Sequence, residues 1–256
     1  MVQFVGAWPG APDLLTLRGA ELLRKADVVI YAGSLVNPEL LAYCREDAEI
    51  YNSARMTLED VLRTVEQAEA AGKTTVRLHT GDPSLYGAIR EQMDALEKLG
   101  IAYAITPGVS SFCAAAAAVG AEFTLPQVSQ SLIISRMAGR TPVPEGERLA
   151  ALAEHGCSMA LFLSAGLLPQ LQEELLRGAY TVDTPVALVY KASWPEERVL
   201  RCTVGTLAET GAKNGITRTA LVLVGNFLGN RYERSKLYDP DFTTLFRRGR
   251  EEENRG

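Results

Sequence analysis

The segment 4–16, FVGAWPGAPDLLT, is a glycine- and proline-rich turn of the kind at which many proteins bind a nucleotide. It fits neither common phosphate-binding pattern. Trp8 and Ala11 occupy positions where the dinucleotide fingerprint needs glycines, and the loop has no lysine for the GxxxxGK pattern. Pro9 and Pro12 also remove N–H groups that would bind an anion. The loop is therefore predicted to hold a ligand without phosphate groups, or to be only a turn.

Two further loops combine glycine with small polar side chains. The sequence TGDP (80–83) has a glycine that permits close backbone approach, and Asp82 offers a carboxylate to a hydroxyl or ammonium group. The sequence TPGVSS (106–111) has a glycine at the turn, with Ser110 or Ser111 as a ligand contact. Both sequences are equally typical of helix N-caps, so capping stays open as their alternative role.

These loops need a sheet to bring them together. Short β-branched runs alternate with helical patterns, which predicts an α/β fold with largely parallel sheets. The predicted strands are 2–7, 27–33, 49–54, 74–82 and 102–108, then 131–137, 159–165, 185–193, 199–205 and 219–225. Each of the three loops follows a predicted strand, and open α/β sheets bind ligands outside the carboxyl ends of their strands.

Helices are predicted between the strands of the first half, at 13–25, 57–71, 84–99 and 112–122, the last being alanine-rich and expected to be buried. The pattern of the sequence changes after Phe123, where one predicted strand lies between two proline-containing loops. We therefore predict an N-terminal α/β domain over 1–122 and a C-terminal α/β domain over 123–256. Its tail ends in a charge run, to which no chemistry is assigned.

Composition excludes several classes of protein. A chain of 256 residues with 47% hydrophobic content can bury one large core or two smaller ones. Its net charge of −5 argues against binding nucleic acid, which normally requires a basic face. The four cysteines are too widely spaced for a disulfide framework or a CxxC metal site, and no apolar stretch is long enough to span a membrane. A cytoplasmic protein without a membrane or nucleic-acid partner is expected.

The combination of motifs resembles one family. The motifs are GAWPGAPDLLTLRG, ADVVIYAGSLV, HTGDPSLYGA, TPGVSSFCAAAA, GRTPVPE, VYKASWPEE and TALVLVG. Together they resemble the tetrapyrrole methylases, S-adenosylmethionine-dependent enzymes of cobalamin and sirohaem synthesis, over nearly the whole chain. Within that family, YAGSLV, GRTPVPE and YKASWPEERVLR are similar to members that methylate C11 of precorrin-4 or cobalt-precorrin-4. The tail YERSKLYDPDFT favours the cobalt branch.

The resemblance implies two α/β domains with an active-site cleft between them, normally in a homodimer. It implies S-adenosylmethionine as methyl donor, S-adenosylhomocysteine as product and a tetrapyrrole as substrate. The implied donor contacts, mostly made by backbone groups, are Pro9, Thr80, Gly81, Asp82, Leu85, Ser110, Ser111, Leu163, Ser164, Ala192, Thr219, Ala220 and Leu221.

The opening loop departs from the family's usual GxGPGDP pattern. Trp8 replaces a common glycine, so its indole is predicted to bind substrate by stacking on the macrocycle, to obstruct the substrate cleft, or simply to pack at the domain seam. Ala11 replaces a common aspartate, which leaves no catalytic acid at that position. The substrate class carries many carboxylates, and arginine suits such groups. The candidate substrate-binding cations, each of which could equally be ordinary surface charge, are Arg55, Arg136, Arg140 and Lys191.

Methyl transfer from a sulfonium to an electron-rich carbon requires no protein nucleophile and no metal, so no catalytic residue is assigned. His79 is expected to be a buried structural histidine rather than a cleft residue, and a metal site at His155 and Cys157 is disfavoured. Alignment of the reactants can supply on the order of 7–11 kcal/mol. Two alternatives stay open: another tetrapyrrole-ring or RNA methyltransferase of the superfamily, and a tetrapyrrole-binding protein whose catalysis is impaired by Trp8.

Overall fold

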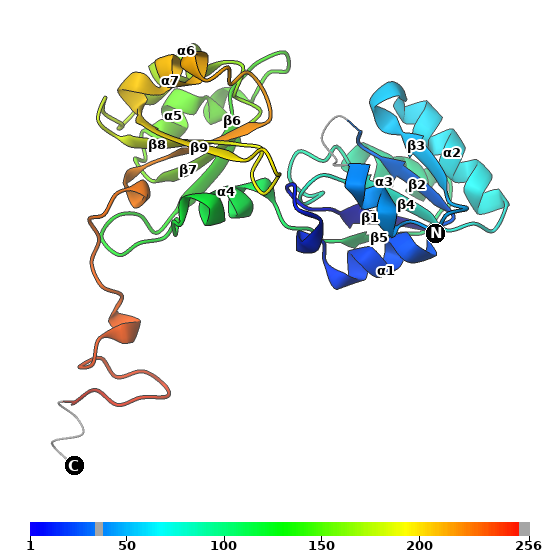
Figure 1. The fold of residues 1–256 in the computed structure, drawn as a ribbon, viewed down its shortest axis with the longest axis horizontal. Helices are drawn as coiled ribbons and strands as arrows, with labels where there is room; N and C mark the ends of the chain where they lie inside the picture. The colour runs from blue at the N-terminus through cyan, green and yellow to red at the C-terminus, as the bar shows by residue number, and fades with distance from the viewer. Residues whose placement is uncertain (34–37, 251–256) are drawn as a thin grey trace. The chain divides into compact units, whose positions relative to one another are not determined.

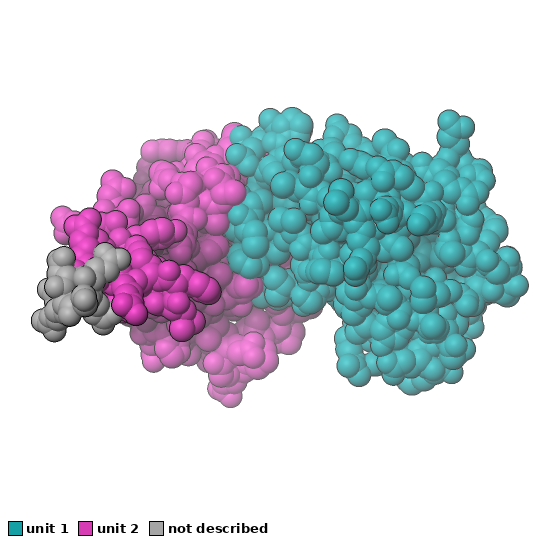
Figure 2. Space-filling view, turned by 90° about the horizontal axis from the view of Figure 1, so that it is seen from below, with its two compact units in different colours: residues 1–115, 191–197 teal, residues 116–190, 198–256 magenta. Residues whose placement is uncertain are grey.

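The computed structural model describes residues 1–33 and 38–250, so the last three residues of the YAGSLV motif lie outside the described residues. The chain forms two compact units, Met1–Ala115 with Lys191–Glu197, and Ala116–Tyr190 with Arg198–Gly256 (Figure 2). The sequence alone places a boundary after residue 122. The compact units instead divide after Ala115, and a short later segment belongs to the first unit.

The first unit contains a five-stranded sheet. Its strands are β1 (Val2–Gly6), β2 (Val28–Tyr31), β3 (Glu49–Asn52), β4 (Thr75–His79) and β5 (Tyr103–Thr106). The order is β3-β2-β4-β1-β5, and every pairing is parallel. Gly6 pairs with His79, and Val5 pairs with Thr106. The carboxyl ends of β1, β4 and β5 are therefore level with one another.

Helices cover both faces of this sheet (Figure 1). They are α1 (Leu17–Lys25), α2 (Leu58–Ala70) and α3 (Arg90–Lys98). Leu23 of α1 packs with Val5 and Leu78 on one face, whereas α2 and α3 pack on the other face around Phe4 and Ile30. Strands β1 and β2 thus contribute alternate side chains to the two cores.

The helix ends follow the capping residues in the sequence. Thr16 accepts a hydrogen bond from the N–H of Gly19 at the start of α1, and Thr57 forms a capping box at the start of α2. The predicted start of α3 at residue 84 was too early. Tyr86 and Ala88 have positive φ angles of 56° and 49°, which are incompatible with a right-handed helix.

The second unit contains a mixed sheet. Its strands are β6 (Leu132–Arg136), β7 (Ser158–Phe162), β8 (Pro185–Tyr190), β9 (Arg198–Thr203) and β10 (Ala220–Val224). The order is β6-β7-β10-β8-β9, with β6 and β7 parallel and the other pairs antiparallel. The prediction of an α/β fold with two sheets is confirmed, and parallel pairs are the majority over both sheets. The antiparallel pair β8–β9 follows from its short connection, 191–197.

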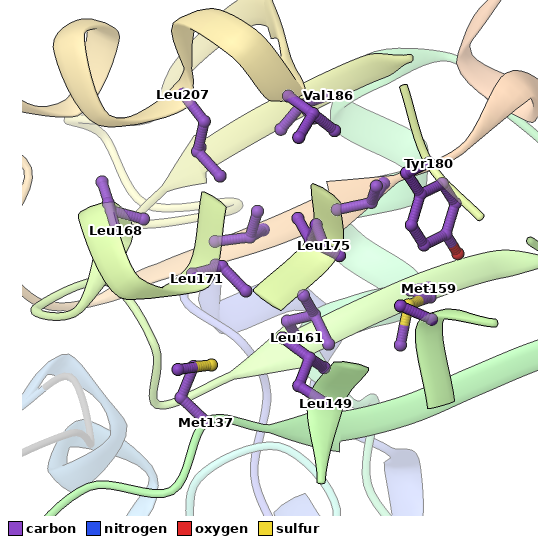
Figure 3. Packing of buried hydrophobic residues seen from close by; sticks show 14 of the residues in the cluster. Met137, Leu149, Met159, Leu161, Leu168, Leu171, Leu175, Tyr180, Val186 and Leu207 are labelled. Carbon is purple, nitrogen blue, oxygen red and sulfur yellow. The ribbon is translucent and has the colours of Figure 1, made fainter. Parts of the chain in front are cut away.

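Three helices pack on one face of the second sheet. They are α5 (Leu149–Ala153), α6 (Leu168–Arg177) and α7 (Leu207–Lys213). Leu171 and Leu175 of α6 are fully buried against Leu161 and Met159 of β7, and Leu207 of α7 joins the same cluster (Figure 3). The hydrophobic spacing of α6 places these leucines on one side of the helix.

Helix α4 (Ser111–Val119) begins in the first unit and ends in the second. The expectation that this alanine-rich helix is buried is only half right, because Ala115 is buried whereas Cys113 and Ala117 are exposed. Among residues 1–33 and 38–250, no helix is long and apolar enough to cross a membrane.

Candidate functional site

Three loops of the first unit meet at the carboxyl ends of β1, β4 and β5. A Cβ atom added to Gly108 would lie 2.1 Å from the carbonyl oxygen of Gly81 and 2.7 Å from the Cα of Gly6. A Cβ on Gly6 would lie 2.4 Å from the nitrogen of Gly108. The three backbones are thus in direct contact, and glycine is required at both positions because no side chain fits between them.

Asp82 links two of these loops. One carboxylate oxygen accepts the N–H of Gly108 at 3.0 Å, and the other accepts the N–H of Ser84 at 2.9 Å together with its hydroxyl. Burial acts to raise the pKa of Asp82, but the hydrogen bonds from Ser84 and Gly108 outweigh it and lower the pKa. The carboxylate is therefore ionised and holds the β4 and β5 loops together.

The predicted donor contacts of the first unit gather around this junction. Gly81 has a φ of 61°, and its N–H donates to the carbonyl of Trp8 at 3.3 Å. A Cβ on Gly81 would lie 3.5 Å from Cα of Ser110 and 3.6 Å from the nitrogen of Ser111. The N–H of Leu85 donates to the carbonyl of Asp82. The structure therefore brings together the residues that the sequence motifs placed after β1, β4 and β5.

Two buried polar atoms at this edge have no hydrogen-bond partner within the described part of the chain: the hydroxyl of Thr80 and Nε2 of His79. Buried polar groups are normally satisfied, so such atoms are candidates to bind a ligand or water. The loop sequences 7–16, 80–85 and 107–111 contain no lysine or arginine. Close backbone approach, an unsatisfied hydroxyl and the lack of cations fit a donor that carries positive charge and no phosphate.

His79 is the last residue of β4 and is 4% exposed. Burial, and secondarily the positive charge of Arg77, lower the pKa of His79 to about 3. Arg77 lies on the same face of the strand and donates to the side-chain oxygen of Gln92 at 3.1 Å and to the carbonyl of Ile30 at 3.0 Å. The imidazole is therefore buried and neutral, as expected, although its Nε2 has no partner in the described residues.

Trp8 is buried in the core of the first unit, which argues against its prediction as a substrate-binding residue. Its side chain is 2% exposed and lies in the core of the first unit with Val5, Leu23, Leu40 and Leu78. A ring enclosed in this way has no free face for stacking on a macrocycle. Trp8 replaces a glycine of the family pattern, but its bulky side chain is buried in this core.

The segment Lys191–Glu197 belongs to the first unit and meets the opening loop. A Cβ on Gly10 would lie 2.8 Å from the carbonyl oxygen of Ala192, which is itself a predicted donor contact. The side chain of Lys191, predicted to bind substrate, instead pairs with Glu196 at 3.2 Å. The lysine charge is thus already partly compensated within its own segment.

The remaining predicted donor contacts lie in the second unit. Antiparallel pairing of β7 with β10 brings the end of β7 beside the start of β10. A Cβ on Gly166, after β7, would lie 3.2 Å from the carbonyl of Thr217, before β10. The two groups of contacts at this edge are Leu163 and Ser164 after β7, and Thr219, Ala220 and Leu221 at the start of β10.

Side chains in this second group differ sharply in exposure. Leu163 has a φ of 52° and is 64% exposed, and Thr219 also has a positive φ, 54°. Ser164 is completely buried, where its hydroxyl donates to the carbonyl of Phe162 at 2.7 Å and accepts the N–H of Met137 at 2.9 Å. Ser164 therefore acts on the loop after β7 rather than as a free ligand group.

The three predicted arginines differ in their surroundings. Arg55 is exposed after β3, separated from β1 by two strands of the sheet. Arg136 donates to the carbonyls of Met137, Thr141 and Pro142, so it holds the 137–142 loop. Arg140, on that loop, is exposed. Arg55 and Arg140 therefore stay candidates to bind a polyacid, whereas Arg136 is engaged with backbone carbonyls.

Sequence reasoning missed Gly6 and Trp194. Gly6 is the last residue of β1 and makes close backbone contacts with Gly108 and Gly81. Its signal was a glycine near the end of a predicted strand, as in TGD and TPG. Trp194 donates its indole N–H to the carbonyl of Pro9 at 2.7 Å. Its signal was weaker, because nothing local connects residues so far apart in the sequence.

Known proteins resemble this chain over most of its length. The model of the family "Tetrapyrrole (Corrin/Porphyrin) Methylases" matches residues 1–208. A cobalt-precorrin-4 C(11)-methyltransferase of Methanocaldococcus jannaschii is 51% identical over 248 residues, covering 96% of each chain. The X-ray structure of the cobalt precorrin-4 methyltransferase CbiF superimposes with a TM-score of 0.88 at 46% identity, covering 90% of this chain and 96% of that one. A uroporphyrin-III C-methyltransferase of Thermus thermophilus, solved with S-adenosylhomocysteine, gives 0.76 at 28% identity, covering 89% and 98%.

Proposed function

The chain belongs to the tetrapyrrole methylase family, and from this membership we propose that it transfers a methyl group from S-adenosylmethionine to C11 of cobalt-precorrin-4 or precorrin-4, in cobalamin biosynthesis. The observation that carries the proposal is the high identity to a cobalt-precorrin-4 C(11)-methyltransferase over 96% of both chains. We propose the cobalt form as the preferred substrate, because the names of that relative and of CbiF both specify cobalt-precorrin-4.

The first unit's loop junction supports donor binding. S-adenosylmethionine, when bound, supplies an electrophilic methyl group on a positively charged sulfur. Backbone groups near Gly81 and Ser110, the unsatisfied hydroxyl of Thr80 and the ionised Asp82 are compatible with such a ligand. Leu163 and Ala220 of the second unit are likewise proposed as donor contacts, as the family resemblance implies.

The protein's part in the reaction is alignment and the exclusion of water. Rigid loops tied together by Asp82 and by the glycine contacts hold their backbone groups in one geometry. Fixing two reactants in line can lower the barrier by about 7–11 kcal/mol. His79 is neutral and buried, so it is not proposed as a general base.

A direct assay tests this function. The protein is mixed with S-adenosylmethionine and either cobalt-precorrin-4 or the metal-free compound, and both products are followed by mass spectrometry. A gain of one methyl group on the tetrapyrrole is expected, faster with the cobalt form, with C11 identified by NMR of the product. Absence of transfer to either tetrapyrrole, with the donor still bound, would contradict the proposal.

The alternatives make different predictions in the same assay. Methyl transfer to RNA and not to tetrapyrrole would assign another substrate, although the net charge of −5 disfavours RNA. Binding of tetrapyrrole without transfer would indicate a binding protein, but burial of Trp8 removes the obstruction on which that alternative was based. We also propose a homodimer in the cytoplasm, as the family resemblance implies, and light scattering of the purified protein tests the dimer.

A further inference from the structure

The segment that connects β8 to β9 has an unusual backbone. Lys191 and Ser193 have φ angles of 48° and 64°. Residues other than glycine, asparagine and aspartate seldom adopt such values. Strain of this kind persists where surrounding contacts over-determine it. The contacts that the segment makes therefore indicate what the strained turn is for.

The strained turn presents its side chains to the opening loop. The indole N–H of Trp194 donates to the carbonyl of Pro9 at 2.7 Å, and the hydroxyl of Ser193 accepts the N–H of Ala11 at 3.0 Å. Between these two bonds, a Cβ on Gly10 would lie 2.1 Å from ring carbon Cδ1 of Trp194. The loop backbone and the indole are therefore in van der Waals contact, with no space for another side chain.

The opening loop depends on such outside partners for its shape. Pro9 and Pro12 have no N–H groups, so the loop has few donors with which to bond to itself. The carbonyl of Trp8 accepts the N–H of Gly81 at 3.3 Å, which fixes the start of the loop. The next carbonyl and the N–H of Ala11 are held by Trp194 and Ser193. Two separate parts of the first unit thus set the conformation of residues 8–11.

The indole of Trp194 is itself held in place. Nζ of Lys191 lies 4.9 Å from the centroid of the ring, a cation–π distance, and 3.2 Å from a carboxylate oxygen of Glu196. The N–H of Ser193 donates to a carboxylate oxygen of Glu197 at 2.6 Å. Lys191 thus restrains the ring of Trp194, and Glu197 restrains the backbone of Ser193. The segment is therefore a rigid support for the loop.

We propose that Trp194 and Ser193 are positioning residues that set the conformation of Pro9–Ala11 for binding the sulfonium donor. The proposal rests on the proposed function, because it takes the opening loop as part of the donor site. Both side chains act on backbone groups of the loop and need not touch the donor. This assigns a role to the SWPE part of the YKASWPEE motif, which methyl transfer by itself does not require.

Calorimetric titration with S-adenosylhomocysteine tests the proposal without any tetrapyrrole. The variant Trp194→Phe keeps an aromatic ring and removes the N–H donor to Pro9. Its dissociation constant is expected to rise about five- to tenfold, as for the loss of one net hydrogen bond. In the methylation assay, KM for the donor should rise while kcat at saturating donor stays near the wild-type value. Ser193→Ala, expected to weaken binding about two- to fivefold, provides a second variant if Trp194→Phe does not fold.

Tyr180→Phe is the matched control. The hydroxyl of Tyr180 donates to the carbonyl of Cys157 at 2.5 Å in the core of the second unit, so this variant also loses one aromatic donor to a backbone carbonyl. It should lower thermal stability and leave affinity for S-adenosylhomocysteine unchanged.

The outcomes separate this inference from the proposed function. Folded Trp194→Phe and Ser193→Ala proteins that bind as tightly as the wild type would overturn the inference and leave methyl transfer intact. Equal weakening in Tyr180→Phe would also overturn it, because the effect would then be one of general stability. A wild-type protein that binds no S-adenosylhomocysteine would overturn the proposed function and this inference with it.

Discussion

In the first unit β1, β4 and β5 run parallel, so three loops that follow strands meet at one edge of the sheet. In the second unit β7 and β10 run antiparallel, so a loop after one strand lies beside the start of another. The first arrangement depends on glycines whose backbones are in contact, and the second includes a buried serine, Ser164, that hydrogen-bonds its neighbours. The same kind of edge can therefore be built from backbone contacts or from a side chain.

The difference has a practical meaning for mutagenesis. In the first unit, adding an atom to Gly6 or Gly108 forces backbones apart. In the second unit, Gly146 has no other atom within 4 Å of an added Cβ, and Gly139 has only the end of a leucine side chain at 3.4 Å. Substitution should thus be severe at Gly6 and Gly108 and mild at Gly146 and Gly139.

The largest effect is expected for Gly108→Ala. Its Cβ would lie 2.1 Å from the carbonyl oxygen of Gly81, so the β4 and β5 loops must separate. A displacement of about 1 Å in a positioning element can cost about 100-fold in rate, so methyl transfer should fall by at least about that factor. Gly146→Ala in the second unit is the control and should retain wild-type activity. Equal activity of Gly108→Ala and Gly146→Ala would contradict this prediction.

A large loss of stability is expected for Trp8→Ala. Removing a buried aromatic side chain typically costs about 3–5 kcal/mol, and urea denaturation measures this. Leu171→Ala in the core of the second unit should cost about 2–5 kcal/mol. If Trp8 instead obstructed the substrate site, Trp8→Ala would be more active per folded molecule than the wild type, and we expect no such increase.

His79 makes the stability of the first unit depend on pH. Burial lowers its pKa from 6.5 to about 3, so the unfolded chain binds a proton at a pH where the folded protein does not. The free energy of unfolding is unaffected by His79 above about pH 6.5. It decreases as the pH is lowered, by up to about 1.4 kcal/mol per pH unit.

Urea denaturation of the wild type and His79→Gln at pH values from about 6.5 to about 4.5 measures that slope. The variant should lose less stability over this range. His155→Gln, which replaces an exposed histidine of the second unit, controls for the general effect of losing a histidine. Parallel pH curves for wild type and His79→Gln would show that His79 gains its proton at the same pH in the folded and the unfolded protein, which would contradict the lowered pKa.

The smallest effect is expected for Arg140→Ala. Its side chain is exposed on the 137–142 loop, and an exposed charge contributes little to binding, less so at high salt. KM for the tetrapyrrole should rise about two- to fivefold at low salt. Arg63→Ala, which removes an exposed arginine from α2 of the first unit, should leave KM unchanged. A salt-independent increase for Arg140→Ala would point to a buried contact instead.

The sequence predicted the strands and the three loops of the first unit well, because their signals are local. Gly81 and Gly108 follow strands, and Thr57 caps a helix, each within a few residues of the element it affects. The burial of Trp8 could not be derived in this way, since it depends on Leu40 and Leu78 from distant parts of the chain. The same holds for the antiparallel pairs of the second sheet, where the direction of a strand depends on which neighbour it selects.

The chain passes between its units after residues 115, 190 and 197, so no single cut separates them cleanly. A fragment that stops at residue 122 would retain every glycine of the loop junction but would lose the residues that anchor Pro9 and Ala11. Split proteins made at that point should recover donor affinity only when the two pieces reassociate. Gene fusions and domain exchanges within such enzymes would need to keep the short β8–β9 connection together with its own opening loop.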